Sequence, residues 1–144
     1  MKYRFDINNY EFNSSSKLGV YLIHGFSSTT YEVKELAEFL SNNGYYTIAK
    51  NLPGHGTTVE ECNRVRFTDW LNQVKKDIAE LSVKCEKVFV IGGSMGGVIS
   101  LYMASLFPLN AYVVGGTVLN FKNPFETNFL VPLLCNFIKI QPKK

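Results

Sequence analysis

The amino-acid sequence predicts a three-layer α/β fold, in which helices cover both faces of a mainly parallel sheet. Short apolar segments rich in β-branched and aromatic residues lie at 18–23, 45–49, 87–91 and 111–119. They lack the polar alternation of a half-exposed strand, which is typical of strands buried on both faces. Helical segments separate them along the chain, and this alternation of strand and helix predicts a parallel sheet.

Amphipathic helices are expected between the first three strands. Apolar residues recur at helical spacing at positions 33, 36, 37 and 40, and again at positions 71, 74, 78 and 81. Thr29 and Glu32 predict a capping box before the first helix, and Gly44 predicts its end. Thr68 and Asp69 predict the N-terminal cap of the second helix.

The segment 88–121 carries no charge, which raises the possibility of a membrane span. Its glycines, together with Pro108 and Asn110, divide it into apolar pieces that are too short to cross a bilayer. We therefore interpret it as strand, helix and strand. The helix, expected at 95–107, is apolar on nearly every side, which predicts burial at the centre of the molecule.

Composition and charge fit one ordinary domain with a substantial core. The 144 residues are 46% hydrophobic and carry a net charge of only +3, with no basic cluster that indicates nucleic acid or an anionic membrane as partner. Cys62, Cys85 and Cys135 have no spacing typical of a disulfide framework or a zinc site, so we expect free thiols, no metal and no cofactor. The polar segment 1–17 does not resemble a secretory signal, and we expect a cytoplasmic protein without stable membrane insertion.

The sequence "GGSMG" at 92–96 fits the G-x-S-x-G pattern between a strand and a helix. In that pattern the serine, here Ser94, sits on a sharp turn with its hydroxyl exposed as a nucleophile. A phosphate-binding glycine turn is the alternative, because it also joins a strand to a helix. Neither G-x-G-x-x-G nor a P-loop lysine accompanies these glycines, which favours the nucleophile.

Two further loops follow predicted strands and should lie near Ser94. They are "HGFSSTT" at 24–30 and "NLPGHGTT" at 51–58. In a parallel sheet, ligands bind beyond the carboxyl ends of the strands, where such loops gather. Acyl transfer also requires backbone N–H groups that stabilise an oxyanion, and Phe26 and Met95 are the candidates to supply them.

The ordered series of strand, "HGF", helix, strand, "PGHG", helix, strand and "GGSMGG" resembles the amino-terminal part of an α/β-hydrolase of the carboxylesterase and monoacylglycerol lipase type. The resemblance implies Ser94 as nucleophile, an oxyanion hole of the Phe26 and Met95 amides, and a carboxylic ester as substrate. Residues 1–120 would form part of the hydrolase core, and 121–144 would begin the cap. In that cap, the aromatic and aliphatic side chains either bind an acyl chain or only pack, and the candidates for binding are Phe125, Phe129 and Leu133.

His24 and His55 are the only histidines, and either is a candidate base or a structural residue. The resemblance implies structural roles for both, because the family's acid and histidine follow the cap. After Ser94 the sequence has one carboxylate, Glu126, and no histidine. We therefore expect an α/β-hydrolase fold that is incomplete at the C-terminus, and little or no activity of the chain alone.

Three interpretations remain open for such a chain. It is a truncated or frameshifted esterase, one half of an enzyme that a separate C-terminal half completes, or a non-catalytic lipid- or acyl-binding or interaction module. An unpaired edge strand at 111–119 would also expose backbone hydrogen-bonding groups, so we expect self-association.

Overall fold

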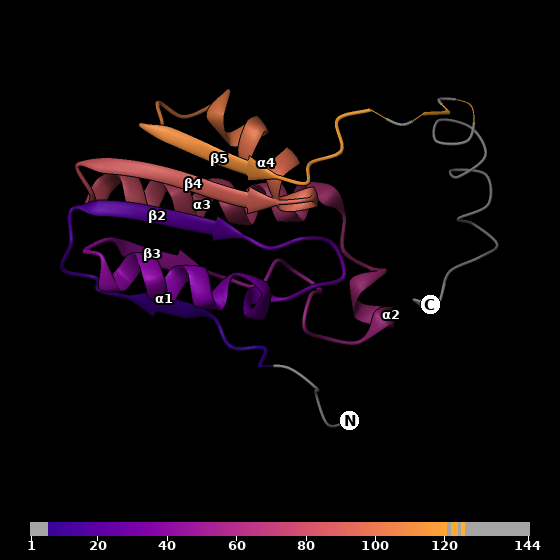
Figure 1. The fold of residues 1–144 in the computed structure, drawn as a ribbon. Helices are drawn as coiled ribbons and strands as arrows, with labels where there is room; N and C mark the ends of the chain where they lie inside the picture. Colours follow the sequence, from indigo (N-terminus) through magenta and orange to yellow (C-terminus); the bar gives the residue numbers. More distant parts are fainter. Residues whose placement is uncertain (1–5, 121, 124, 126–144) are drawn as a thin grey trace.

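A computed structural model describes residues 6–120, 122, 123 and 125, and its centre is a five-stranded sheet (Figure 1). The strands lie in the order β1-β3-β2-β4-β5. Along the chain the elements are β1 (Tyr10–Phe12), β2 (Leu18–Ile23), the 3₁₀ helix η1 (Thr30–Val33), α1 (Lys34–Asn42), β3 (Tyr46–Ala49), α2 (Val59–Cys62), α3 (Phe67–Lys84), β4 (Lys87–Gly93), α4 (Met95–Ala104) and β5 (Ala111–Gly115).

The sheet is mainly parallel, as the sequence predicts. Strands β2 to β5 all run parallel to one another, and only β1 pairs in the antiparallel sense, with β3. The four predicted strands are present, although β5 ends at Gly115 rather than at 119. Strand β1 was not predicted, because its three residues are too short to show a periodic pattern.

Helices cover both faces of the sheet and form three layers with it (Figure 1). Alternate residues of β2 point to opposite sides. Tyr21 and Ile23 join the larger core cluster with α3 and α4, whereas Val20 and Leu22 join the smaller cluster with α1. All four side chains are almost fully buried. Because both faces of β2 are buried, its sequence shows a continuous apolar segment instead of alternation.

The predicted capping box at Thr29 and Glu32 is wrong. Thr29 caps η1 by accepting a hydrogen bond from the Tyr31 N–H. The Glu32 carboxylate does not return to Thr29 but accepts a hydrogen bond from the Gly25 N–H. The tighter 3₁₀ turn changes the direction of the side chain at this position, so Glu32 faces the loop that follows β2.

Helix α3 begins earlier than the predicted cap at Thr68 and Asp69. Its first residue is Phe67, and the Asp69 carboxylate accepts a hydrogen bond from the Arg66 N–H at 2.8 Å. Asp69 therefore does stabilise this helix terminus, but from inside the first turn. The short helix α2 was not predicted, although Thr58 and Glu61 form a capping box at its start.

Helix α4 ends at Ala104, three residues before the predicted end at 107. Ile99 and Met103 are fully buried, whereas Tyr102, on the same helix, is exposed. The expected central burial is thus confirmed for one side of the helix only. Over residues 6–120, 122, 123 and 125, no helix has the length and apolar character that crossing a bilayer requires.

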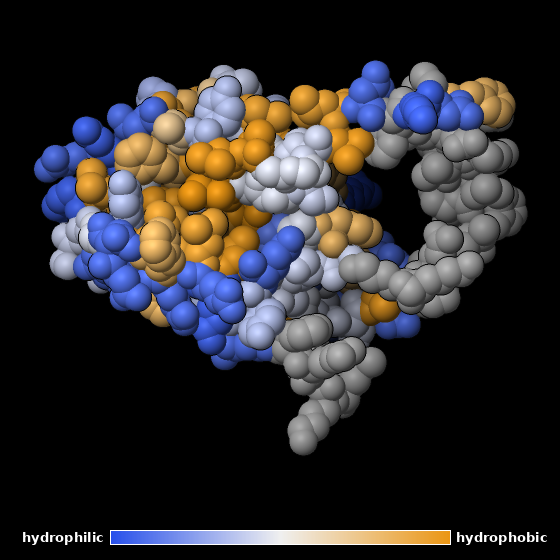
Figure 2. Space-filling view, viewed as in Figure 1, coloured by the Kyte–Doolittle hydropathy of each residue, from blue (hydrophilic) through white to orange (hydrophobic). Residues whose placement is uncertain are grey.

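An apolar groove of about 150 Å³ lies over β4 and β5 on the α1 side of the sheet. Its lining includes Val20, Leu40, Phe89, Ile91 and Val113. Figure 2 shows the hydrophobic area at this place, above α1. Within the described residues β5 pairs only with β4, and every residue of β5 is exposed. This part of the sheet therefore presents both an open edge and an apolar face.

Candidate active site

Ser94 occupies the turn between β4 and α4, as the G-x-S-x-G pattern predicts. It is exposed, and its backbone has φ 51° and ψ −118°. An L-residue with this combination is strained, and such conformations cost about 1–3 kcal/mol and cluster at functional sites. The turn thus holds the serine out of both the strand and the helix.

Two glycines of the pattern are required because the backbones around Ser94 approach each other closely. A Cβ atom on Gly92 would lie 2.2 Å from the Gly96 carbonyl oxygen. A Cβ atom on Gly96 would lie 2.2 Å from the carbonyl oxygen of Ile23, at the end of β2. Larger residues at these positions would push α4 away from the sheet, so the glycines set the sharpness of the turn.

The loop after β2 lies directly beside Ser94. A Cβ atom on Gly25 would be 3.5 Å from the Ser94 Cβ. Phe26 is the next residue, and within the described part of the chain its N–H donates to no protein group. Met95 is the first residue of α4, so its N–H has no acceptor within the helix. The positive end of the α4 dipole also lies here, which favours negative charge.

Glu32 is the carboxylate that reaches this loop. Its Oε2 accepts a hydrogen bond from the Gly25 N–H at 2.7 Å. Its Oε1 lies 4.0 Å from the position of a Cβ on Gly93, the residue before Ser94. The sequence alone did not reveal this contact, because the position of Glu32 after Thr29 is equally typical of a helix cap.

His24 is buried and connects two loops. Its Nδ1 lies 2.8 Å from the Gly25 carbonyl oxygen, and its Nε2 accepts a hydrogen bond from the Leu52 N–H at 3.0 Å. An Nε2 that accepts is unprotonated, so the proton of this ring is on Nδ1 and is donated to Gly25. Burial lowers the pKa of His24 to about 4. With both nitrogens engaged, His24 acts as a structural residue here.

His55 is also buried, in an aromatic cluster with His24, Phe26 and Trp70. Its Nδ1 lies 3.4 Å from the Pro53 carbonyl oxygen. Its Nε2 is buried and makes no hydrogen bond to the described residues. Burial lowers the pKa of His55, so the ring is neutral near neutral pH.

A cavity of about 420 Å³ lies between the loop after β2 and the loop after β3. Phe26, His55, Val59 and Cys62 supply part of its lining, and serine, threonine and glycine residues supply most of the rest. The cavity adjoins the candidate oxyanion hole through Phe26. Its mixed lining suits a ligand with an apolar part and hydroxyl groups.

No base contacts the candidate nucleophile within the residues that the structure describes, where the Ser94 hydroxyl has no hydrogen bond to His24 or His55. No cluster of histidine, cysteine and carboxylate side chains in that part of the chain is suited to hold a metal ion. Phe125 is 64% exposed. Phe129 and Leu133, the other two candidates for acyl binding, lie outside the described residues, as does nearly all of the predicted cap at 121–144.

Comparison with known proteins places this chain in a family. The model of the alpha/beta hydrolase fold matches residues 20–131. The chain is 38% identical over 103 residues to a thermostable monoacylglycerol lipase of Bacillus sp. (strain H-257), a match that covers 67% of this chain and 41% of the lipase. It is 34% identical over 95 residues to a carboxylesterase of Bacillus subtilis (strain 168), covering 65% of this chain and 39% of the esterase.

Solved structures give the same result. One of them comes from work on LipS and LipT, two metagenome-derived lipolytic enzymes. It has a TM-score of 0.78 at 27% identity, and the match covers 84% of this chain and 50% of the chain of that structure. The monoacylglycerol lipase of Paleococcus ferrophilus has a TM-score of 0.66 at 25% identity, and the match covers 92% of this chain and 52% of the lipase. The chain spans about half the length of the proteins that it matches. The family match over most of the sequence shows that the chain belongs to the alpha/beta hydrolase fold family.

Proposed function

We propose that this chain carries the nucleophile and the oxyanion hole of a serine hydrolase that acts on carboxylic esters. The strained, exposed Ser94 beside the loop of Gly25 is the observation that carries this proposal. A serine held at such a cost to the backbone is typical of a nucleophile rather than of a structural turn. The names of the relatives, a monoacylglycerol lipase and a carboxylesterase, favour carboxylic esters as substrates, and within that class we propose monoacylglycerols or short-chain esters.

In the proposed reaction, the Ser94 Oγ attacks the ester carbonyl carbon while its proton passes to a base. The Phe26 and Met95 N–H groups then stabilise the oxyanion of the tetrahedral intermediate. Collapse of the intermediate breaks the bond to the alcohol, which leaves with the proton and gives an acyl-serine. Water hydrolyses the acyl-serine by the reverse sequence of proton transfers.

We infer that the base comes from outside residues 1–144, since His55 makes no hydrogen bond to Ser94 within the described residues. His24 uses both ring nitrogens in hydrogen bonds, and the sequence has no histidine after Ser94. Without a base, a serine hydrolase retains only the catalysis of its oxyanion hole and binding, about 10³–10⁴-fold over water. A complementing segment, in the same or a separate polypeptide, would restore the remainder.

A fluorophosphonate probe with added imidazole as external base tests this proposal. Mass spectrometry should find the probe on the peptide that contains Ser94, and imidazole should accelerate labelling. The Ser94→Ala variant should not be labelled. If the wild-type chain stays unmodified at Ser94 with imidazole present, or if labelling survives Ser94→Ala at another residue, Ser94 is not the nucleophile.

Within the described residues no base is hydrogen-bonded to Ser94, which favours a second candidate function, in which the chain is a non-catalytic acyl-binding module. The cavity between the loops at Phe26 and His55 would then hold a monoacylglycerol without turnover. Saturable binding of monoacylglycerol with no release of glycerol, together with an unlabelled Ser94, would support this function. Absence of binding at millimolar ligand would eliminate it.

A further inference from the structure

We propose that Glu32 is a positioning residue, whose carboxylate holds Gly25 so that the Phe26 N–H stays directed at the reacting oxygen. The inference rests on the proposed function, because it assigns how that oxyanion hole is kept in shape. The contact that carries it is the 2.7 Å hydrogen bond from the Gly25 N–H to the Glu32 Oε2. Hydrogen bonds from backbone N–H groups to ionised carboxylates are roughly twice as strong as neutral ones.

Several contacts hold this loop, including those of the Phe26 ring with His55 and Trp70, and the Glu32 contact is the one that fixes the Gly25 N–H. Gly25 is a flexible residue by itself, and Ser27 adopts a positive φ of 56°. One backbone hydrogen bond lies within the turn, from the Ser28 N–H to the Gly25 carbonyl at 3.3 Å. The His24 Nδ1 donates a second hydrogen bond to this Gly25 carbonyl oxygen. Glu32 supplies the complementary contact, to the N–H.

The 3₁₀ helix η1, which carries Glu32, is itself held in place by hydrogen bonds. Glu32 belongs to η1, and the first residue of η1, Thr30, makes two hydrogen bonds to other segments. The Thr30 N–H donates to the Asn51 side chain at 3.0 Å, and the Thr30 hydroxyl donates to the Asn8 carbonyl. Glu32 thus connects Gly25, through η1, to the loops around β1 and β3.

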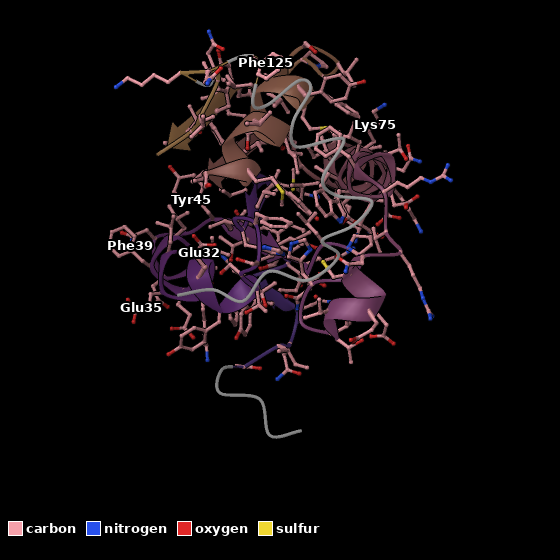
Figure 3. All side chains as sticks on the ribbon, turned by 90° about the vertical axis from the view of Figure 1, so that its right-hand side faces the viewer. Glu32, Glu35, Phe39, Tyr45, Lys75 and Phe125 are labelled. Carbon is pink, nitrogen blue, oxygen red and sulfur yellow. The ribbon has the colours of Figure 1, made fainter. Side chains whose placement is uncertain are left out.

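Glu32 also lies beside the other half of the candidate site. Its two carboxylate oxygens are near Gly25 and near Gly93, which flank the space where Ser94 is exposed. Glu35, one helical turn further, has no such contact and lies at the outer edge of the view in Figure 3, whereas Glu32 lies further in. Glu35 therefore provides a matched control for the loss of a surface carboxylate.

The first test is the backbone amide signal of Gly25 in the ¹⁵N-labelled full chain. In the wild type, the Gly25 proton should be shifted downfield and protected from exchange. Glu32→Ala should remove both properties and broaden or shift the Phe26 amide. Glu32→Gln, which keeps an acceptor oxygen, should retain most of them, and Glu35→Ala should change neither. Unchanged Gly25 and Phe26 amides in Glu32→Ala would overturn the inference.

The second test is the rate at which the fluorophosphonate labels Ser94 with imidazole present. Loss of one oxyanion donor costs about 10²–10³-fold in related chemistry, so misplacing it in Glu32→Ala should slow labelling at least about 10-fold. Glu32→Gln should stay within about 3-fold of the wild type, and Glu35→Ala should equal it. A wild-type rate in Glu32→Ala overturns the positioning role. If wild-type Ser94 is not labelled at all, the proposed function fails, and the amide signals of Gly25 and Phe26 alone decide whether Glu32 holds the loop.

Discussion

Replacing the candidate nucleophile by glycine should make the protein more stable than replacing it by alanine. The backbone of Ser94, at φ 51° and ψ −118°, is strained for any residue with a Cβ atom. Ser94→Ala keeps the Cβ and therefore the strain, whereas Ser94→Gly relieves it. Both variants lose the same hydroxyl, so their difference isolates the backbone.

The expected difference follows from two opposing contributions. A strained residue of this kind costs about 1–3 kcal/mol. Glycine is penalised by about 0.5–1 kcal/mol relative to alanine, because its unfolded chain has more freedom. The free energy of unfolding of Ser94→Gly should therefore be about 1 kcal/mol higher than that of Ser94→Ala. For a domain of this size that corresponds to roughly 3 °C in melting temperature.

Chemical denaturation followed by circular dichroism measures this difference, and thermal unfolding checks it. Ser82, in the last part of α3, provides the matched control, because its helical backbone has no such strain. There the order should reverse, with Ser82→Gly about 1 kcal/mol less stable than Ser82→Ala. If Ser94→Gly is equal to or less stable than Ser94→Ala, the turn stores no strain and our main argument for a nucleophile is refuted.

Three other predictions concern the core, the pH dependence and the open edge. Asp77→Ala should lower the free energy of unfolding by about 3 kcal/mol in urea denaturation, because this buried carboxylate accepts hydrogen bonds from Tyr21 and Lys50. Since burial lowers the pKa of His24 to about 4, the unfolded chain binds more protons, and stability should fall by up to about 3 kcal/mol as the pH drops from about 6.5 to 4. His24→Gln should flatten that part of the pH profile. Val113→Lys, on exposed β5, should raise the apparent dissociation constant of self-association about 10-fold in sedimentation velocity, since burying a valine contributes about 1.5 kcal/mol.

The parallel core of the fold was predictable because its central strands β2 and β3 are buried on both faces. Burial favours continuous apolar segments, such as Leu18–Ile23 in β2 and residues 88–91 in β4, and these are visible in the sequence. The elements that were not predicted are short or stabilised by distant contacts. Strand β1 pairs only at the edge, and α2 is a single capped turn without buried residues. Neither carries a periodic pattern.

The residues of the candidate site also divide into those that the sequence predicts and those that it does not. Ser94 and its glycines were predictable, because a sharp strand-to-helix turn imposes small residues at fixed spacing. Glu32 was not, since a glutamate three residues after a threonine fits a capping box as well as a loop contact. The choice between them depends on whether the first turn is α-helical or 3₁₀, which is a matter of tertiary contacts at Thr30. Acyl-binding roles for Phe129 and Leu133 remain predictions.

The register between β2 and β4 explains why Ser94 and the loop of Gly25 lie side by side. Ile23 lies opposite Gly92 in the parallel pair. Gly25 and Ser94 each follow two residues later, so they leave the sheet side by side. A slip of one residue would separate them and turn the apolar side chains of β2 to the wrong face, which burial of both clusters forbids. The neighbourhood of the candidate nucleophile and the proposed oxyanion loop is therefore decided by sheet pairing within this chain, whereas the proposed proton transfer would require a base from outside residues 1–144.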